Sequence, residues 1–451
     1  SASATTGASS PAASSASAWS ARTATRLAVS PARPRLEHTA AVFQGWRLYP
    51  GQRRAERRGR PGDLLSSEQP ASLRRRAVIA AANDGASPLL GRNSARRIGN
   101  RVEEGIEQVH GRTDAIRINA SKSSQREHSS PIYLTSSFTF DSAEEARQMF
   151  AEEIEGNIYS RYSNPNSSDL IQKVCAAEGT ESGIATSSGM AAMFGSIASL
   201  LQQGDHILAS RSLFGSTHQL LTRVFPKWGI TSTYGDISDY TNWDKLVQPN
   251  TKMLFIETPS NPGLEIIDLE WAGKFAAAHN LILVVDNCFA TPYLQQPAKW
   301  GAHIVTHSAT KYIDGQGRVL GGLILGKQEL IKEVQFFTRH TGPSISPFNA
   351  WILSKSMETL AVRMDRHCEN ALKIATYFEG NPELDDVRYP FLKSHPQHDL
   401  ALKQMKAGGG IITLTLKGGL ARAQRFIDQL QMISITPNLG DSRSIITHPA
   451  S

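Results

Sequence analysis

Short apolar segments rich in β-branched residues recur through the middle of the chain, and this feature constrains the fold most. The segments are HILAS (206–210), GITSTYG (229–235), KMLFIET (252–258), LILVVDN (281–287), HIVTHS (303–308) and GGLILG (321–326). Helix-length segments separate most of them. Residues 268–280 form one such segment, with these apolar residues on a single helical face: Leu269, Ala272, Phe275 and Ala276. Buried strands that alternate with helices predict an α/β fold with a doubly wound, largely parallel sheet.

The N-terminal quarter of the chain has a different composition from the rest. It is rich in Ser and Ala and then in Arg; residues 1–100 contain 16 Arg, no Lys and 5 acidic residues, a net charge of +11. The formal charge of the chain is +7, so the remaining residues carry −4. The basic character therefore belongs to an extension, and the globular part is not expected to bind nucleic acid.

We expect residues 1–110 to be a disordered extension, because their composition cannot bury a large apolar surface. An organellar transit peptide, for a plastid or mitochondrion, is Ser- and Arg-rich and poor in acids, as here. A wrongly assigned upstream segment is equally compatible. A basic nucleic-acid tail is less so, because interleaved aromatic residues are few. Without a functional transit peptide we expect a cytoplasmic protein.

Two classes of function are disfavoured by composition. No apolar segment approaches the roughly 18 residues that a membrane-spanning helix needs, so we expect a soluble protein without a membrane partner. The three cysteines, Cys175, Cys288 and Cys368, are far apart and form no ligand cluster with histidine. This spacing disfavours zinc and a disulfide framework, and it predicts buried structural thiols. We expect no metal site.

Polar residues follow several of the predicted strands, at the edge where such sheets bind ligands. Asp286 ends the most hydrophobic strand, and Ser308, Thr310 and Lys311 follow another. The segment TSSGMAAM (186–193) joins a short strand to a helix, so the N–H groups of Gly189 and Met190 would form an anion site. The segment around Lys311 lacks the spacing of a P-loop.

A lysine beside a phosphate site, together with an aspartate in an apolar setting, suits pyridoxal phosphate (PLP). The lysine amine can bind the cofactor aldehyde covalently, and a carboxylate can keep the pyridine nitrogen protonated. Each residue alone is weak evidence, since an aspartate after a strand is usually a cap and a lone lysine is usually solvated. Their shared position at one edge of the sheet favours the PLP hypothesis.

From about Ala115 onward the chain resembles the PLP-dependent enzymes of cystathionine and methionine metabolism, the trans-sulfuration family. The motifs that carry the resemblance are EHSSPIYLTSSF (127–138), YSRYSNPN (159–166), SSGMAA (187–192), RSLFGSTH (211–218), FIETPSNP (255–262), VVDNCFATP (284–292), HSATKYIDGQGRVLGG (307–322) and GPSISPFNAW (342–351). The resemblance implies a fold-type-I PLP enzyme related to aspartate aminotransferase, with a large cofactor domain and a smaller C-terminal α/β domain. It further implies an N-terminal arm at 111–170, a PLP-binding domain at 171–360 and a C-terminal domain at 361–451.

The resemblance also implies a role for each matching residue. Lys311 would bind PLP covalently and Asp286 would pair with the pyridine nitrogen. Asn261 would contact the phenolic oxygen of the cofactor. The phosphate would be held by a larger set: Ser308, Thr310, Gly189 and Met190.

The tyrosine and arginine of the Y-x-R motif reach the phosphate of a neighbouring subunit in this family. Tyr159 and Arg161 would therefore act in trans, and the protein would be a homo-oligomer, with a tetramer expected.

Phe214 departs from the pattern of most relatives, which place a tyrosine here to stack on the cofactor ring and assist proton transfer. Phenylalanine can stack but cannot transfer a proton, so Lys311 would act as the general acid and base. A phenylalanine within RSLFGSTH resembles the sulfhydrylase branch of the family. This implies γ-replacement on an O-acylhomoserine, expected to be O-succinylhomoserine, with sulfide as acceptor and homocysteine as product. A cystathionine γ-synthase or a γ-lyase is the alternative.

The C-terminal residues are the second departure. GGGIITLTL (408–416), GGLARAQRFIDQLQM (418–432) and SITP (434–437) predict a strand, a helix and a strand of the small domain. Relatives continue to a strand whose arginine binds the substrate α-carboxylate, whereas this chain ends at GDSRSIITHPAS. Asn438 is the substrate-binding candidate that is left, and Arg443 is assigned no role. A PLP-binding fragment with impaired catalysis is therefore the non-enzyme alternative.

Overall fold

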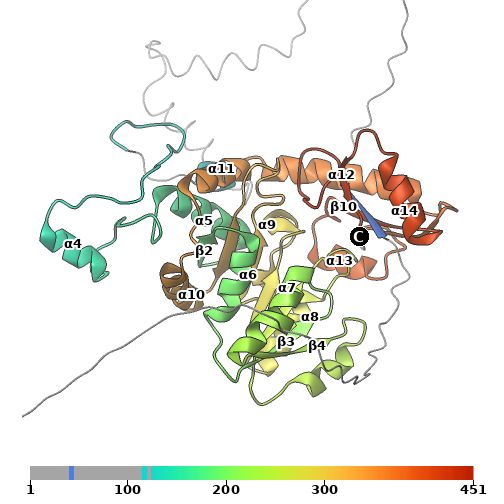
Figure 1. The fold of residues 1–451 in the computed structure, drawn as a ribbon, viewed down its shortest axis with the longest axis horizontal. Coiled ribbons are helices and arrows are strands. Elements are labelled where there is room, and N and C mark those ends of the chain that lie inside the picture. Colours follow the sequence, from blue (N-terminus) through green and yellow to red (C-terminus); the bar gives the residue numbers. More distant parts are fainter. Residues whose placement is uncertain (1–39, 45–113, 119–122, 450–451) are drawn as a thin grey trace, which may run out of the picture. The chain divides into compact units, whose positions relative to one another are not determined.

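The computed structural model describes residues 40–44, 114–118 and 123–449 (Figure 1). The predicted extension, residues 1–110, lies outside the described residues except for one strand, β1 (Ala40–Gln44). Within the described part of the chain, no helix is long and apolar enough to cross a membrane.

A seven-stranded sheet forms the centre of the larger part of the molecule. Its strands run in the order β2-β8-β7-β6-β5-β3-β4. Their bounds are β2 Ser182–Thr186, β3 His206–Ser210, β4 Thr231–Gly235, β5 Thr251–Glu257, β6 Ile282–Asp286, β7 Ile304–Ser308 and β8 Gly322–Gly326. The strands from β7 to β4 are parallel, while β8 is antiparallel to both of its neighbours. The prediction of a largely parallel sheet is confirmed.

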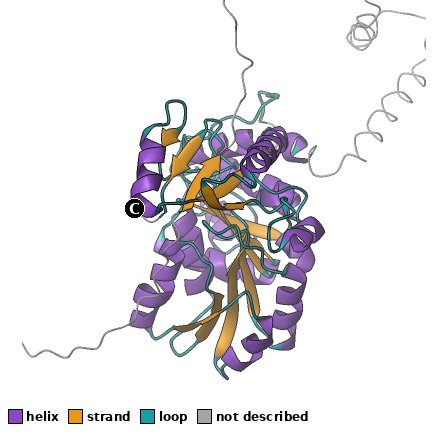
Figure 2. Ribbon diagram, turned by 90° about the vertical axis from the view of Figure 1, so that its right-hand side faces the viewer, coloured by secondary structure: helices purple, strands orange, loops and turns teal. Residues whose placement is uncertain are grey.

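Burial on both faces explains why the central strands are so apolar. Leu283, Val284 and Val285 of β6 are fully buried, as expected for a strand of a parallel sheet that is covered on both sides. Figure 2 shows helices flanking the strands on both sides. The longer helices of this part are α5 Pro165–Glu178, α6 Gly189–Ala198, α8 Leu269–Ala278, α10 Gln328–Thr341 and α11 Pro347–Met357. In α8 the buried residues are those of the predicted face: Leu269, Ala272, Phe275 and Ala276.

A five-stranded sheet forms the second part, in the order β11-β12-β1-β10-β9. The strands other than β1 are β9 Leu384–Arg388, β10 Ile411–Leu416, β11 Ser434–Ile435 and β12 Ile445–Thr447. Its helices are α12 Leu360–Phe378, α13 His398–Gln404 and α14 Gly419–Asp428. The predicted strand, helix and strand correspond to β10, α14 and β11, and sequence reasoning missed β12.

The position of β1 is a finding that the sequence did not suggest. This strand pairs antiparallel with both β10 and β12. The segment belongs to the region that sequence analysis assigned to an extension, yet these five residues fill the middle of the small sheet.

The remaining α-helices are short. The helices are α3 Asp114–Arg117, α4 Ala143–Phe150, α7 Gly215–Gln219 and α9 Thr291–Leu294. The cysteines are free thiols; Cys175 and Cys368 are buried as expected, whereas Cys288 is only half-buried.

Candidate active site

The carboxyl ends of β5, β6 and β7 meet at one edge of the large sheet. They end in Glu257, Asp286 and Ser308, which border a cavity of about 320 Å³. Parallel neighbours bring their ends to the same edge, which is where ligands bind in such folds. The other predicted site residues that line this cavity are Gly189, Met190, Phe214, Asn261, Thr310 and Lys311.

A helix N-terminus and a hydroxyl lie close together at one wall of the cavity. Helix α6 begins at Gly189, after Ser188, whose Oγ accepts a hydrogen bond from the N–H of Ala191 at 3.2 Å. A Cβ at Gly189 would lie 2.5 Å from the Cβ of Ser308, so only glycine fits there. The first N–H groups of a helix lack partners within the helix and favour an anion. This wall suits a phosphate group.

Thr310 is fixed by the chain that follows it. Its Oγ1 donates to the carbonyl of Gly321 at 3.3 Å and accepts from the N–H of the same residue at 3.2 Å. The N–H of Lys311 donates to the carbonyl of Ser308 at 3.2 Å, which closes a turn between the two hydroxyl residues and the lysine. This turn explains how adjacent hydroxyls and the lysine all reach one cavity.

Asp286 is 5% exposed and accepts a hydrogen bond from the N–H of Cys288 at 3.0 Å. Burial raises the pKa of its carboxyl group to about 6, and the Cys288 N–H and the nearby His307 act in the opposite direction. A cationic partner would stabilise the ionised form of this carboxyl group, because a buried charge is unfavourable unless it is paired. A protonated pyridine nitrogen would be a suitable partner.

The side chain of Lys311 reaches across to the small domain. Its Nζ donates to Oδ1 of Asn438 at 3.1 Å. The loop that carries Asn438 packs tightly here: Gly440 has a φ of +84°, and a Cβ on it would lie 2.4 Å from the backbone of Lys311. A non-glycine residue would therefore be strained and would displace the loop. Asn438 itself does not line this cavity but a neighbouring pocket that it shares with Thr310 and Lys311. Arg443 pairs with Asp441 at 2.8 Å and lines neither.

Phe214 lines the cavity and is 41% exposed. Its N–H donates to Oε2 of Glu257 at 2.6 Å, so its backbone is held although its side chain is half-exposed. Asn261 lines the cavity from the loop that follows β5.

Tyr159 and Arg161 do not line this cavity. The guanidinium of Arg161 lies over the rings of Tyr159 and Tyr162, at 5.5 and 4.8 Å from their centroids, and donates to the carbonyl of Arg339. Their predicted role toward a neighbouring subunit stays a prediction.

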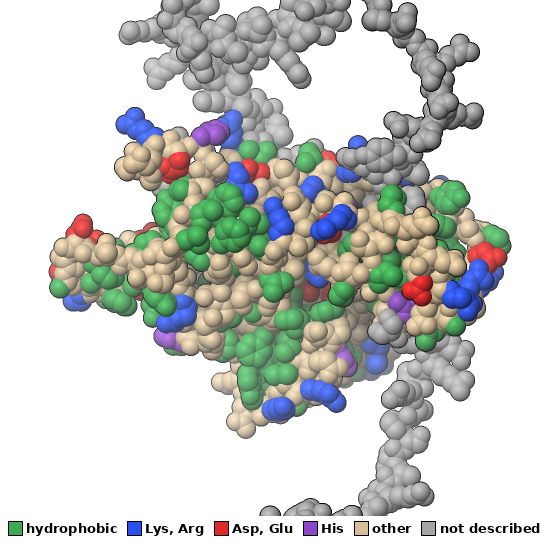
Figure 3. Space-filling model, turned by 45° about the horizontal axis from the view of Figure 1, so that its top comes forward, with side chains coloured by type: hydrophobic (Ala, Val, Ile, Leu, Met, Phe, Trp, Pro, Cys, Tyr) green, Lys and Arg blue, Asp and Glu red, His purple; other side chains and the backbone are tan. Residues whose placement is uncertain are grey.

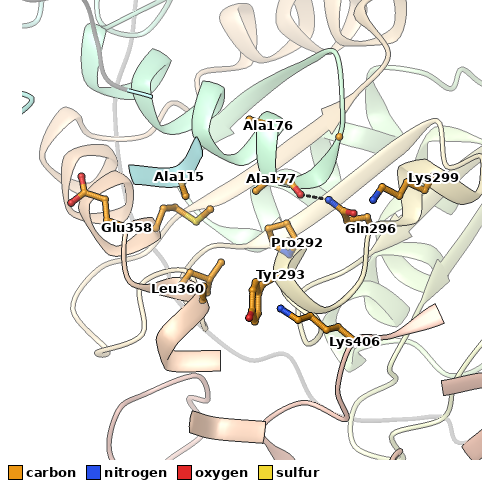
Figure 4. Close-up of a pocket in the computed structure, with 13 residues that line it drawn as sticks. Ala115, Ala176, Ala177, Pro292, Tyr293, Gln296, Lys299, Glu358, Leu360 and Lys406 are labelled. Carbon is orange, nitrogen blue, oxygen red and sulfur yellow. Dashed lines mark hydrogen bonds between the residues drawn. The ribbon is translucent and has the colours of Figure 1, made fainter. Parts of the chain in front are cut away.

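A larger cavity, of about 460 Å³, lies elsewhere and contains none of the predicted site residues (Figure 4). Lys406 points toward Tyr293, with its Nζ 3.7 Å from the ring centroid. Nothing in its lining resembles the phosphate wall or the lysine–aspartate pair, so chemistry is assigned to the smaller cavity.

Sequence reasoning missed several residues that line the active-site cavity: Ser188, Met193, Ser216, Glu257, Cys288, Phe289, Leu320, Pro437 and Leu439. Glu257 could have been found, because it ends a buried strand in the same way as Asp286 does. Among the described residues, no group of three His, Cys, Asp or Glu side chains could hold a metal ion.

The family model for Cys/Met metabolism PLP-dependent enzymes matches residues 112–451. The chain belongs to this family. Its enzymes use PLP, and the residues described above fit that cofactor: a helix N-terminus beside hydroxyls, a buried carboxyl group and a lysine border one cavity.

The chain is also similar to individual members of the family. The chain is 45% identical over 351 residues to an O-succinylhomoserine sulfhydrylase of Pseudomonas aeruginosa, covering 78% of this chain and 87% of that protein. It is 42% identical over 325 residues to an L-methionine γ-lyase of Treponema denticola, covering 71% and 81%.

A solved structure shows the same fold with the cofactor in place. A candidate O-acetylhomoserine (thiol)-lyase of Campylobacter jejuni has a TM-score of 0.73 and 33% identity, covering 76% of this chain and 89% of that one. That structure holds N′-pyridoxyl-lysine-5′-monophosphate.

Proposed function

We propose that this enzyme catalyses γ-replacement on O-succinylhomoserine with sulfide, which gives homocysteine and succinate for methionine biosynthesis. The observation that carries the proposal is a cavity lined by Lys311 and Phe214 and, among the described residues, by no tyrosine. The similarity to O-succinylhomoserine sulfhydrylase supports the choice of substrate.

The residues of the cavity divide the binding of the cofactor among them. Gly189, Met190, Ser308 and Thr310 would hold its phosphate group, and Lys311 would hold it covalently. Asp286 would hold a proton at the pyridine nitrogen, and Asn261 would contact the phenolic oxygen. When bound, PLP withdraws electrons from the α-carbon of the substrate.

Lys311 would carry the protons of the reaction. With the substrate amine at the cofactor, the free amine of Lys311 would remove the proton from Cα of the substrate and later return it. Transfer of a proton from Cβ would let succinate leave Cγ with its electron pair, sulfide would bond to Cγ in its place, and Cβ would regain its proton. Phe214 would stack on the cofactor and exclude water, without taking a proton.

Asn438 would orient the substrate. Its Oδ1 lies 3.1 Å from Nζ of Lys311, so a substrate that displaces the lysine would meet the amide. An amide offers both a donor and an acceptor, and its N–H groups could bind the α-carboxylate.

We propose a homo-oligomer, with a tetramer expected, in which Tyr159 and Arg161 bind the phosphate in a neighbouring subunit. The arm that precedes them supports this. Helix α4 has no buried residue, and Figure 1 shows it apart from the other helices. Large apolar side chains of the arm are exposed: Ile132, Leu134, Phe150 and Ile154. Figure 3 also shows hydrophobic side chains gathered in patches on the surface, as expected of a subunit with partners.

Methionine γ-lyase activity is the second candidate, because the Treponema denticola relative is nearly as similar. The two activities, together with that of a cystathionine γ-synthase, separate in one assay. O-succinylhomoserine and O-acetylhomoserine should be supplied with sulfide or with cysteine, and methionine should be tested alone. The proposal predicts the highest kcat/KM for O-succinylhomoserine with sulfide. Preference for cysteine, or faster cleavage of methionine, would assign the enzyme to the other activities.

A further inference from the structure

Two glutamates tie together the same pair of loops beside the cavity. One loop carries Phe214, and the other carries Asn261. Glu265 accepts hydrogen bonds from the hydroxyls of Ser212 and, at 3.3 Å, Ser260, one on each loop. Glu257 accepts a hydrogen bond from the backbone N–H of Phe214 at 2.6 Å on one loop, and the backbone N–H of Asn261 on the other loop is close enough to lower the pKa of its carboxyl group.

Glu257 differs from Glu265 in its position. It lines the cavity and is 5% exposed, whereas Glu265 does not line it. The hydrogen bond that Glu257 accepts from the N–H of Phe214 holds the backbone of a residue whose side chain is half-exposed.

Glu257 also stands beside the carboxyl group expected to meet the pyridine nitrogen. Glu257 and Asp286 are register partners on the parallel strands β5 and β6. Neighbouring strands lie about 4.8 Å apart, and register partners point to the same face. Two buried carboxyl groups this close disfavour double ionisation.

The charged surroundings of the pair come from three elements. Burial, and then the charge of Asp286, raises the pKa of Glu257 well above its ordinary value. His307 on β7 favours ionised Asp286. The thiol of Cys288, on the loop after β6, faces both carboxyl groups and Lys311, which lies on the loop after β7.

We propose that Glu257 is a positioning residue for PLP: its carboxyl group holds the loops of Phe214 and Asn261 at the cofactor, beside Asp286. The inference rests on the family's cofactor and not on the acyl donor. A test that reads PLP binding is therefore independent of the proposed sulfhydrylase activity.

The test uses the full chain, freed of PLP and titrated with it, as wild type, Glu257→Ala, Glu257→Gln and Glu181→Ala. Glu257→Ala removes the acceptor of the Phe214 N–H and should weaken PLP binding about tenfold, whereas Glu257→Gln, the neutral isostere, can still accept that bond and should restore the affinity to within about threefold of wild type. Glu181→Ala is the matched control, because Glu181 also accepts a backbone N–H, that of Gln328 at 2.9 Å, but does not line the cavity; PLP affinity should not change.

The second readout is the comparison of the two Glu257 variants, since a purely structural or purely charged role would not be rescued by glutamine. Wild-type PLP affinity in Glu257→Ala would overturn the proposal, as would equal weakening in Glu257→Gln or in Glu181→Ala. If neither Glu257 variant folds by thermal unfolding of the PLP-free protein, the residue is structural and the proposal fails.

Discussion

The two sheets contribute to the active site in different ways. The large sheet supplies residues at its strand ends, where Asp286 and Ser308 are fixed by the parallel register of β6 and β7. The small sheet supplies a loop, and Asn438 reaches Lys311 only because that loop packs on the lysine backbone through Gly440. The difference suggests that cofactor binding belongs to the large sheet, and that substrate orientation depends on how the small domain sits against it.

Lys311→Ala should have the largest effect, because we propose this residue both as the covalent attachment and as the proton carrier. We expect kcat/KM to fall by at least about 10² to 10⁴-fold, the usual contribution of a general acid–base. Borohydride reduction followed by peptide mass analysis should find pyridoxyl phosphate on the Lys311 peptide of wild type and on no peptide of the variant. Lys332→Ala, an exposed lysine of α10, is the control. An adduct on another lysine of the wild type would refute the assignment.

Asp286→Asn tests whether residues at the strand ends of the large sheet bind the cofactor. Loss of the charged partner should weaken PLP binding about ten- to a hundredfold. The pH dependence follows from the sign of the shift. The pKa of Asp286 is raised from 3.8 to about 6 in the folded protein, so its ionisation destabilises the PLP-free fold as pH rises through that range.

A protonated pyridine nitrogen relieves this cost, so wild-type PLP affinity should fall as pH drops below about 6. The cofactor phosphate also titrates near pH 6. Because Asp286→Asn lacks the carboxyl group, its pH profile shows only the contribution of the phosphate to PLP affinity. PLP titrations from pH 5 to 8 provide the measurement. Identical pH profiles for the two proteins would show that Asp286 does not meet the nitrogen.

Asn438→Ala tests whether the loop of the small domain orients the substrate. Loss of one hydrogen-bonding group should lower kcat/KM about five- to tenfold, mainly through KM, while PLP affinity stays unchanged. Steady-state kinetics and PLP titration should be run on the same preparation. A PLP affinity that falls together with kcat/KM would break the proposed division between the two sheets.

A chain shortened to residues 113–451 should give the smallest effect on the cofactor. It lacks β1, which pairs only with strands of the small sheet. We expect PLP affinity within about threefold of the full chain, since distant sites behave independently, and earlier thermal unfolding of the small domain. Calorimetry and PLP titration would measure both. Loss of PLP binding would show that the large sheet depends on the small one.

Much of this architecture could be predicted from local patterns. The strands of the large sheet follow apolar segments such as LILVVDN, because a strand buried on both faces must be apolar along its whole length. The buried face of α8 follows from helical period. The segments around Gly189 and Lys311 carry their chemistry within a few residues, so their roles could be proposed from the sequence and the family it resembles.

Other features depend on contacts between segments far apart in the chain. Glu257 pairs with Asp286 through strand register, and Asn438 meets Lys311 from 127 residues away. Strand β1 enters the small sheet from a segment whose composition suggested no structure. Local propensity and motif describe each segment by itself, whereas register and close packing bring separate segments together. The sequence by itself therefore determined the elements and the chemistry of the cofactor edge, and only the tertiary structure decided which side chains meet across it.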